Sequence, residues 1–125
     1  MNKLLLFPVI LLLSTLQLSA QQKSYREIWL FTSDAANASF ITQKSALTDV
    51  TGLNERDIQV HEIVGSKFHQ ALFKKYKAST QNFTFILIGK DGGEKLRSTQ
   101  PISKEKLYRI IDDMPMRKSE MKHQS

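Results

Sequence analysis

The sequence contains no cysteine among its 125 residues. Disulfides, thiol catalysis, cysteine-bound zinc and iron–sulfur clusters are therefore excluded for this chain. A bacterial lipoprotein is excluded as well, because its lipid is attached to a cysteine. Proline and glycine are scarce, at 3 and 5 residues, and there is no low-complexity tract. The longest apolar run, residues 4–13, is far shorter than the roughly 20 residues of a membrane-spanning helix.

What the sequence does contain is the composition of one globular domain. Hydrophobic residues make up 41% and charged residues 24% of the chain. The 18 basic and 12 acidic residues give a formal net charge of +6. Such a charge permits an anionic partner, but it also fits a surface that only keeps the protein soluble.

The first twenty residues have the three-part pattern of a secretory signal peptide. Lys3 precedes the apolar run, and a more polar stretch ends in the small residue Ala20. We expect cleavage after Ala20 and a periplasmic or secreted protein; the alternative is a retained N-terminal anchor. The predicted boundaries are a signal peptide at 1–20, a flexible lead-in at 21–26, one domain at 27–116 and a basic tail at 117–125.

Hydrophobic periodicity predicts strands and helices in a definite order. A helix over 38–51 is indicated by Phe40, Gln43, Leu47 and Val50 at helical spacing, with Gly52 as its end. The last helix begins after Ser103, and Pro115 is expected to end it, which leaves residues 116–125 as a loose tail. The predicted strands are 27–33, 58–64, 83–89 and 94–99, and the other helix is 66–77.

The resulting order is β-α-β-α-β-β-α. A βαβ unit followed by a β-hairpin and a covering helix is the order of the thioredoxin core. We therefore predict an α/β fold of the thioredoxin-like class, with a central mixed sheet flanked by helices.

Two stretches in the second half resemble the signatures of a known family. They are 83–98 (FTFILIGKDGGEKLRS) and 111–121 (IDDMPMRKSEM). Together they resemble domain of unknown function 4174, a thioredoxin-like domain of small exported bacterial proteins that also occurs in secreted sushi-repeat matrix proteins. The resemblance spans residues 28–121. It implies a thioredoxin-like fold outside the cytoplasm, and it implies no established activity.

The positions that carry thioredoxin chemistry are changed in this chain. Residues 32–37 (TSDAAN), where the first strand leads into the first helix, contain no thiol, and residues 80–83 lack the proline that precedes the third strand in such folds. Disulfide exchange and peroxidase chemistry are excluded. The hydroxyls of Thr32 and Ser33 beside a helix N-terminus suggest a small-anion site, but capping of that helix by Asp34 or Asn37 explains these residues better.

Other catalytic patterns are missing from the sequence. The three histidines form no metal-ligand spacing, so we expect surface histidines and no metal or cofactor. Gly65-Ser66 is better explained as a helix cap than as a nucleophile. Asp112 and Asp113 are adjacent on a helix, so they point about 100° apart and are expected at a solvated helix end rather than as an acid pair.

Topology gives one sharper hypothesis about a site. In a thioredoxin arrangement, the turn at 90–93 and the end of the last helix meet at the end of the sheet opposite the former redox centre. We expect a contact site there, and the alternative is a local ion pair between Asp91 and Arg117 that fastens the hairpin to the helix. The candidate binding residues are Lys90, Asp91, Lys95, Arg97 and Arg117.

Two function classes follow from the sequence. The first is a non-catalytic binding module of the bacterial envelope, whose partner is an anionic envelope component or another envelope protein. The second is an enzyme of unrecognised, non-thiol chemistry in the thioredoxin-like cleft. The missing thiols and the missing acid–base patterns favour the first, and no nucleic-acid partner is expected.

Overall fold

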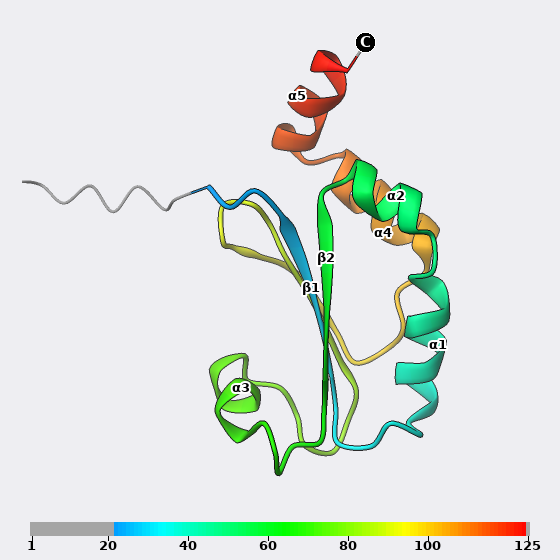
Figure 1. Ribbon diagram of the computed structural model, residues 1–125, viewed down its shortest axis with the longest axis vertical. Coiled ribbons are helices and arrows are strands. Elements are labelled where there is room, and N and C mark those ends of the chain that lie inside the picture. Colours follow the sequence, from blue (N-terminus) through cyan, green and yellow to red (C-terminus); the bar gives the residue numbers. More distant parts are fainter. Residues whose placement is uncertain (1–21, 125) are drawn as a thin grey trace, which may run out of the picture.

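A four-stranded mixed sheet forms the centre of the computed structural model, which describes residues 22–124 (Figure 1). The strand order is β2-β1-β3-β4. Strand β1 pairs in parallel with β2 and antiparallel with β3, and β3 pairs antiparallel with β4. The predicted signal peptide lies outside the described residues. The strands are β1 (Arg26–Thr32), β2 (Ile58–Val64), β3 (Thr84–Ile88) and β4 (Glu94–Ser98).

The two central strands are apolar on both faces, which is why they lie in the middle of the sheet. Ile28 and Leu30 of β1 join the larger core beneath α1 (Ala38–Ala46) and α4 (Lys104–Asp112). Phe31 and Ile86 point to the other face and pack with Phe73 of α3 (Gln70–Lys75). The predicted fold class is confirmed.

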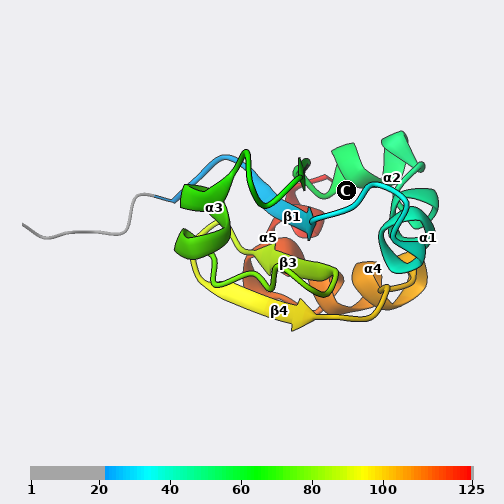
Figure 2. The ribbon, with the colours of Figure 1, turned by 90° about the horizontal axis from the view of Figure 1, so that it is seen from below.

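The helices divide between the two faces and one end of the sheet. Figures 1 and 2 show α1, α2 (Val50–Glu55) and α4 on one face and α3 on the other. The last helix, α5 (Pro115–His123), lies at the end of the sheet where the hairpin between β3 and β4 turns.

The predicted helix over 38–51 is wrong: it is two helices. The side chain of Asp49 accepts a hydrogen bond from the Gly52 N–H and so starts α2. Gly52 lies inside α2 rather than ending a helix, and a Cβ at this position would lie only 2.5 Å from the Tyr108 hydroxyl. The break moves Val50 off the buried face, and this residue is 65% exposed.

The predicted helix over 66–77 is shorter than expected. Gly65 has a positive φ of 93°, and its carbonyl accepts a hydrogen bond from the Phe68 N–H in a turn. Ser66 therefore caps no helix, and α3 begins only at Gln70. Phe68 lies in this turn, outside the helix, and is 88% exposed.

Both ends of the predicted domain also differ from expectation. Arg26, assigned to a flexible lead-in, is the first residue of β1 and only 1% exposed. The expected loose tail is mostly helix α5. Pro115 does end α4, but it also occupies the first turn of α5, where a missing N–H costs nothing.

Candidate functional site

The former redox end of the sheet is occupied by hydrogen bonds within the chain. Asn37 caps α1 by accepting from the Phe40 N–H, while Asp34 accepts from the Ala36 N–H. The Ser33 hydroxyl donates to the Thr80 carbonyl at 2.5 Å and contacts the Ser66 hydroxyl. These polar groups are already partnered, so the capping interpretation is the better one, with Asn37 rather than Asp34 as the cap.

At the opposite end, the β3–β4 hairpin turn is fixed by its own side chains. Asp91 accepts from the Gly93 N–H at 2.9 Å and from the Lys95 ammonium at 2.7 Å. The hydrogen bond from Lys95 is the larger cause that lowers the pKa of Asp91, and the Gly93 N–H adds to it. Asp91 therefore stays ionised near neutral pH.

Lys90 joins the hairpin to the last helix. Its Nζ lies 2.8 Å from an Asp57 carboxylate oxygen and 2.7 Å from Oε1 of Glu120 in α5. Burial lowers the pKa of Lys90, but the bonds to Asp57 and Glu120 outweigh burial and leave that pKa above its usual value. The turn and α5 thus meet through this side chain.

Glu120 also binds the buried arginine of β1. Arg26 donates from both terminal nitrogens to the two Glu120 oxygens, at 3.1 and 3.2 Å, and to the Arg56 carbonyl at 2.9 Å. Such forked pairs are among the stronger hydrogen bonds in proteins. Burial raises the pKa of Glu120, but the bonds from Arg26 and Lys90 outweigh it, and the net pKa lies below the usual value.

A second acid, Asp112, accepts hydrogen bonds from two further arginines. Arg56 donates to both of its oxygens, at 3.0 and 2.9 Å, and Arg117 donates to one at 3.1 Å. Asp112 is therefore not the solvated helix end that was expected. These bonds overcome the effect of burial and lower the pKa of Asp112. We call the connected set the hairpin-end network: Arg26, Arg56, Asp57, Lys90, Asp112, Arg117 and Glu120.

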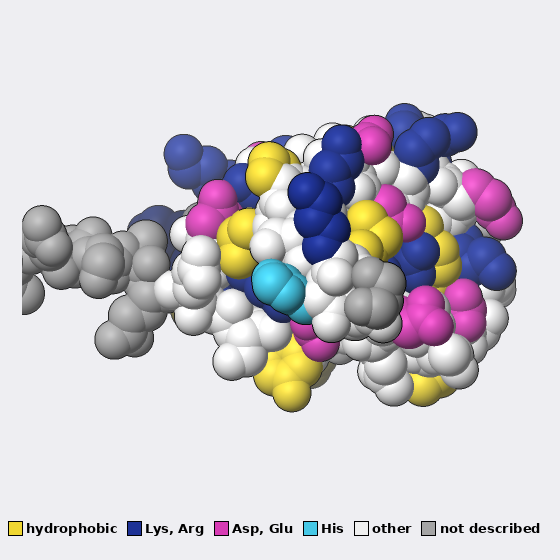
Figure 3. Space-filling view, turned by 90° about the horizontal axis from the view of Figure 1, so that it is seen from above, with side chains coloured by type: hydrophobic (Ala, Val, Ile, Leu, Met, Phe, Trp, Pro, Cys, Tyr) yellow, Lys and Arg dark blue, Asp and Glu magenta, His cyan; other side chains and the backbone are white. Residues whose placement is uncertain are grey.

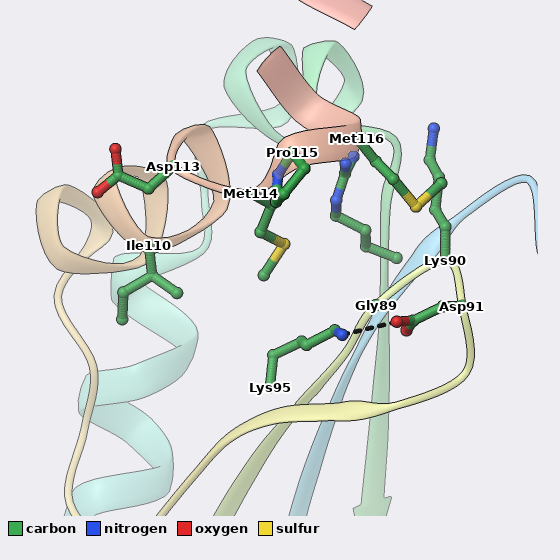
Figure 4. Close-up of a pocket in the computed structure, with 10 residues that line it drawn as sticks. Gly89, Lys90, Asp91, Lys95, Ile110, Asp113, Met114, Pro115 and Met116 are labelled. Carbon is green, nitrogen blue, oxygen red and sulfur yellow. Dashed lines mark hydrogen bonds and ion pairs between the residues drawn. The ribbon is translucent and has the colours of Figure 1, made fainter. Parts of the chain in front are cut away.

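Between the hairpin and the α4–α5 junction lies a cavity of about 510 Å³, which we call the hairpin-end cavity (Figure 4). This volume is within the range of small-molecule sites. Figure 3 views this end of the molecule from above and shows acidic and basic side chains interspersed around apolar ones. The charged residues lining the cavity are Arg26, Lys90, Asp91, Lys95 and Asp113.

The apolar lining comes from the α4–α5 junction. Ile110, Met114, Pro115 and Met116 line this side, and Gly89 lines the opposite one. Figure 4 shows Met114 pointing from the junction toward Lys95, whose ammonium reaches across to Asp91. The cavity therefore has an apolar wall opposite an ion pair.

The predicted site residues are only partly brought together. Lys90, Asp91 and Lys95 line the hairpin-end cavity. Arg97 instead pairs with Glu94 and donates to the carbonyls of residues 76 and 77, near α3. Arg117 has a side chain only 5% exposed. The alternative ion pair between Asp91 and Arg117 is wrong, because each has a different partner.

Sequence reasoning missed Arg26, Glu120 and the apolar wall. Arg26 was missed because a charged residue before a strand is normally exposed. Its partner lies 94 positions away, and no local pattern connects the two. Ile110 and Met114 lie four residues apart in the sequence, a spacing that indicates the core-facing side of a helix rather than the wall of a cavity.

The histidines do not form a ligand set. His61 stacks on Trp29, with ring centroids 4.2 Å apart, and its Nε2 lies 3.8 Å from Glu27. Among residues 22–124 no group of three or more acidic or histidine side chains is placed to hold a metal ion. Over the same residues no helix has the length and apolarity to cross a membrane.

Two solved structures are similar to this chain. The crystal structure of Trxlp from Edwardsiella tarda EIB202 matches with a TM-score of 0.56 and 22% identity, covering 74% of this chain and 86% of that one. The crystal structure of StoA from Bacillus subtilis matches with a TM-score of 0.42 and 11% identity, covering 70% of this chain and 83% of that one. No curated protein matches the chain. The likeness to Trxlp supports the thioredoxin-like fold alone.

The family model described as "Domain of unknown function (DUF4174)" matches residues 17–120. This range includes the whole sheet, the signature stretch at 83–98 and all but the last residue of the stretch at 111–121. The chain therefore belongs to the DUF4174 family.

Proposed function

We propose that this protein is a non-catalytic binding module that takes its ligand at the hairpin-end cavity. The observation that carries the proposal is the cavity itself, an apolar wall facing cationic side chains at the end of the sheet away from residues 32–37. A concave, mostly apolar site with a few polar groups is typical of small-molecule recognition.

The chemistry of the cavity favours binding over catalysis. A general acid or base works best when its pKa lies near the working pH. Asp91 is held ionised by Lys95 and the Gly93 N–H, with its pKa lowered. Lys95 is engaged in the same ion pair at 2.7 Å, and Asp91, ionised in that pair, is not poised to exchange a proton near pH 7.

We further propose that the protein acts after export, with an anionic envelope component as its ligand. The signal-peptide pattern at residues 1–20 and the net basic charge support this location and this ligand class. Fractionation of cells expressing the full chain, with sequencing of the N-terminus of the recovered protein, tests it. An uncleaved chain in the cytosol would contradict export.

A ligand screen by nuclear magnetic resonance tests the binding role. The ¹⁵N-labelled protein would be titrated with envelope anions, namely fatty acids, sugar acids, phospholipid headgroups and short peptides. We expect at least one compound to shift the amide signals of Lys90, Asp91, Lys95 and Met116. Shifts confined to residues 33, 66 and 80 would instead place binding at the former redox end and contradict the proposal.

A further inference from the structure

One donor in the hairpin-end cavity has no partner. Arg26 lines the cavity and is 1% exposed, and its terminal nitrogens are bound to Glu120 and the Arg56 carbonyl. Its Nε, however, is buried with no hydrogen-bond acceptor in the described part of the chain. A buried N–H of a charged group without an acceptor is costly, so this atom points to a ligand oxygen.

A second set of donors lies beside it. Helix α5 starts at the cavity with Pro115 and Met116, after Met114 at the N-cap position, and no side chain caps its first turn. Pro115 has no N–H, so the donors there are the backbone N–H groups of the residues that follow it. The first N–H groups of an α-helix have no acceptor within the helix, and the helix dipole favours a negative charge there. Arg26 and the residues at the start of α5 line the same cavity, so both sets of donors belong to one site.

The charge and surface of the cavity limit what this acceptor is. Three cationic and two acidic side chains line it, which leaves a formal charge of +1. Arg26 and Lys90 are also paired with the carboxylates of Glu120 and Asp57, which do not line the cavity. With these two acids counted the site has no positive excess, so one negative charge is less unfavourable there than the two of a phosphate dianion. The apolar wall of Ile110, Met114, Pro115 and Met116 offers contact to a hydrocarbon rather than to a sugar.

Resting on the proposed binding role, we propose that the ligand is a monocarboxylate with an unbranched apolar chain, such as a medium-chain fatty acid. The carboxylate accepts from Arg26 Nε and from the first turn of α5, and it competes with Asp91 for Lys95. The hydrocarbon lies along Met114 and Ile110. A planar group with two acceptor oxygens suits two donors that approach from different elements.

Titration with decanoate, kept below its micelle-forming concentration, tests the ligand class. Decanol supplies the same chain without the charge, and inorganic phosphate supplies charge without the chain. We expect decanoate to bind one per protein and at least about tenfold more tightly than either, since a charge-assisted hydrogen bond contributes a factor of that order. Equal binding of decanol would overturn the carboxylate.

Matched variants locate the binding. Met114→Trp fills the cavity, and Lys95→Gln removes a partly exposed charge without touching the core. Lys74→Gln, on α3 at the far end, is the control for loss of one positive charge. We expect decanoate affinity to fall about tenfold in Met114→Trp and about threefold in Lys95→Gln, with Lys74→Gln unchanged. Circular dichroism checks that each variant is folded. If Met114→Trp does not fold, the comparison of Lys95→Gln with Lys74→Gln alone decides the proposal.

The possible failures are distinct. Equal loss in Lys95→Gln and Lys74→Gln would mean nonspecific charge attraction and overturn the site. If decanoate fails while another screened compound shifts the amides of Lys90, Asp91 and Met116, the ligand class is wrong and the binding role stands. If no compound shifts those amides, both proposals fail.

Discussion

The two ends of the sheet use opposite kinds of polar chemistry. At the former redox end, neutral groups such as Ser33 and Asn37 bond to nearby backbone, mostly at the surface. At the hairpin end, seven charged residues form the hairpin-end network, and Arg26 and Arg117 are almost fully buried. Residues 32–37 therefore form ordinary loop structure, whereas the network of charged side chains lies at the other end of the sheet, beside the cavity.

The largest expected effect comes from removing the acid that connects three elements at the hairpin end. Glu120→Leu leaves the Arg26 guanidinium buried without its carboxylate and deprives Lys90 of one partner. We expect a loss of about 3 kcal/mol in the free energy of unfolding, measured by urea denaturation. Glu105→Gln, in the first turn of α4, is the control and should change stability by less than about 0.5 kcal/mol. An equal loss of unfolding free energy in the two variants would mean that Glu120 contributes no more to stability than a surface acid.

Acid should remove part of the same stabilisation. The pKa values of Glu120 and Asp112 are lower in the folded protein than usual, so the folded state binds fewer protons in acid than the unfolded state. Their contribution is complete above the unfolded pKa values of about 4 and is lost as the pH falls through the folded ones. Urea unfolding between pH 7 and pH 3 measures the loss. Glu120→Gln should flatten this acid limb, and an unchanged slope would contradict the assignment.

An intermediate effect is expected where α2 supports the network. A Cβ on Gly52 would lie 2.5 Å from the Tyr108 hydroxyl, whose ring stacks 3.8 Å from the Arg56 guanidinium. Gly52→Ala should cost about 2 kcal/mol of unfolding free energy. Gly92→Asn is the control, since nothing lies within 4 Å of its Cβ position and asparagine tolerates a positive φ.

The same variant has a spectroscopic readout. Burial, together with the hydrogen bond to Asp49, raises the pKa of Tyr108 to about 12. Gly52→Ala pushes the Asp49 and Tyr108 side chains apart, so this pKa should fall, as followed by ultraviolet titration of tyrosinate. If neither the tyrosinate titration nor the unfolding free energy changes, α2 can move to accept the added methyl group at no cost, which would contradict the prediction.

The smallest effect is expected at the former redox end. Ser33→Ala removes two exposed hydrogen bonds, to Thr80 and Ser66, and should change the unfolding free energy by no more than about 0.5 kcal/mol. Decanoate binding, measured by the same titration, should not change. A marked loss of decanoate affinity in Ser33→Ala would show that residues near Ser33 influence the hairpin-end cavity, and it would contradict the difference drawn between the two ends of the sheet.

The sequence predicts those parts of the fold that depend on local pattern. Strand β2 has the predicted bounds of 58–64, and Ser103 caps α4 as expected, because both follow from short-range periodicity and capping chemistry. The meeting of the hairpin turn with the end of the last helix is also found as predicted. It follows from the strand directions alone.

What the sequence could not predict is how buried polar and charged side chains find their partners. Gln43 illustrates the principle: its helical position marked a buried face, but only the structure reveals that it bonds to the Ile102 N–H and carbonyl. Asp112 and Arg117 were likewise identifiable as charged residues, but not as partners. Periodicity identifies the buried face of an element and says nothing of the distant group that satisfies a polar side chain there.

The bond between Arg26 and Glu120 also has a consequence for the order of folding. It joins the first strand to the last helix across 94 positions, so it forms only after nearly all the chain has been synthesised. Contacts of such long sequence separation are made late and slowly. All four strands precede α5 in the chain, so the sheet does not depend on this helix being synthesised. The charges at the hairpin end are fully paired only when α5 docks and brings Glu120 to Arg26 and Lys90. We therefore expect the docking of α5 to be the last step of folding.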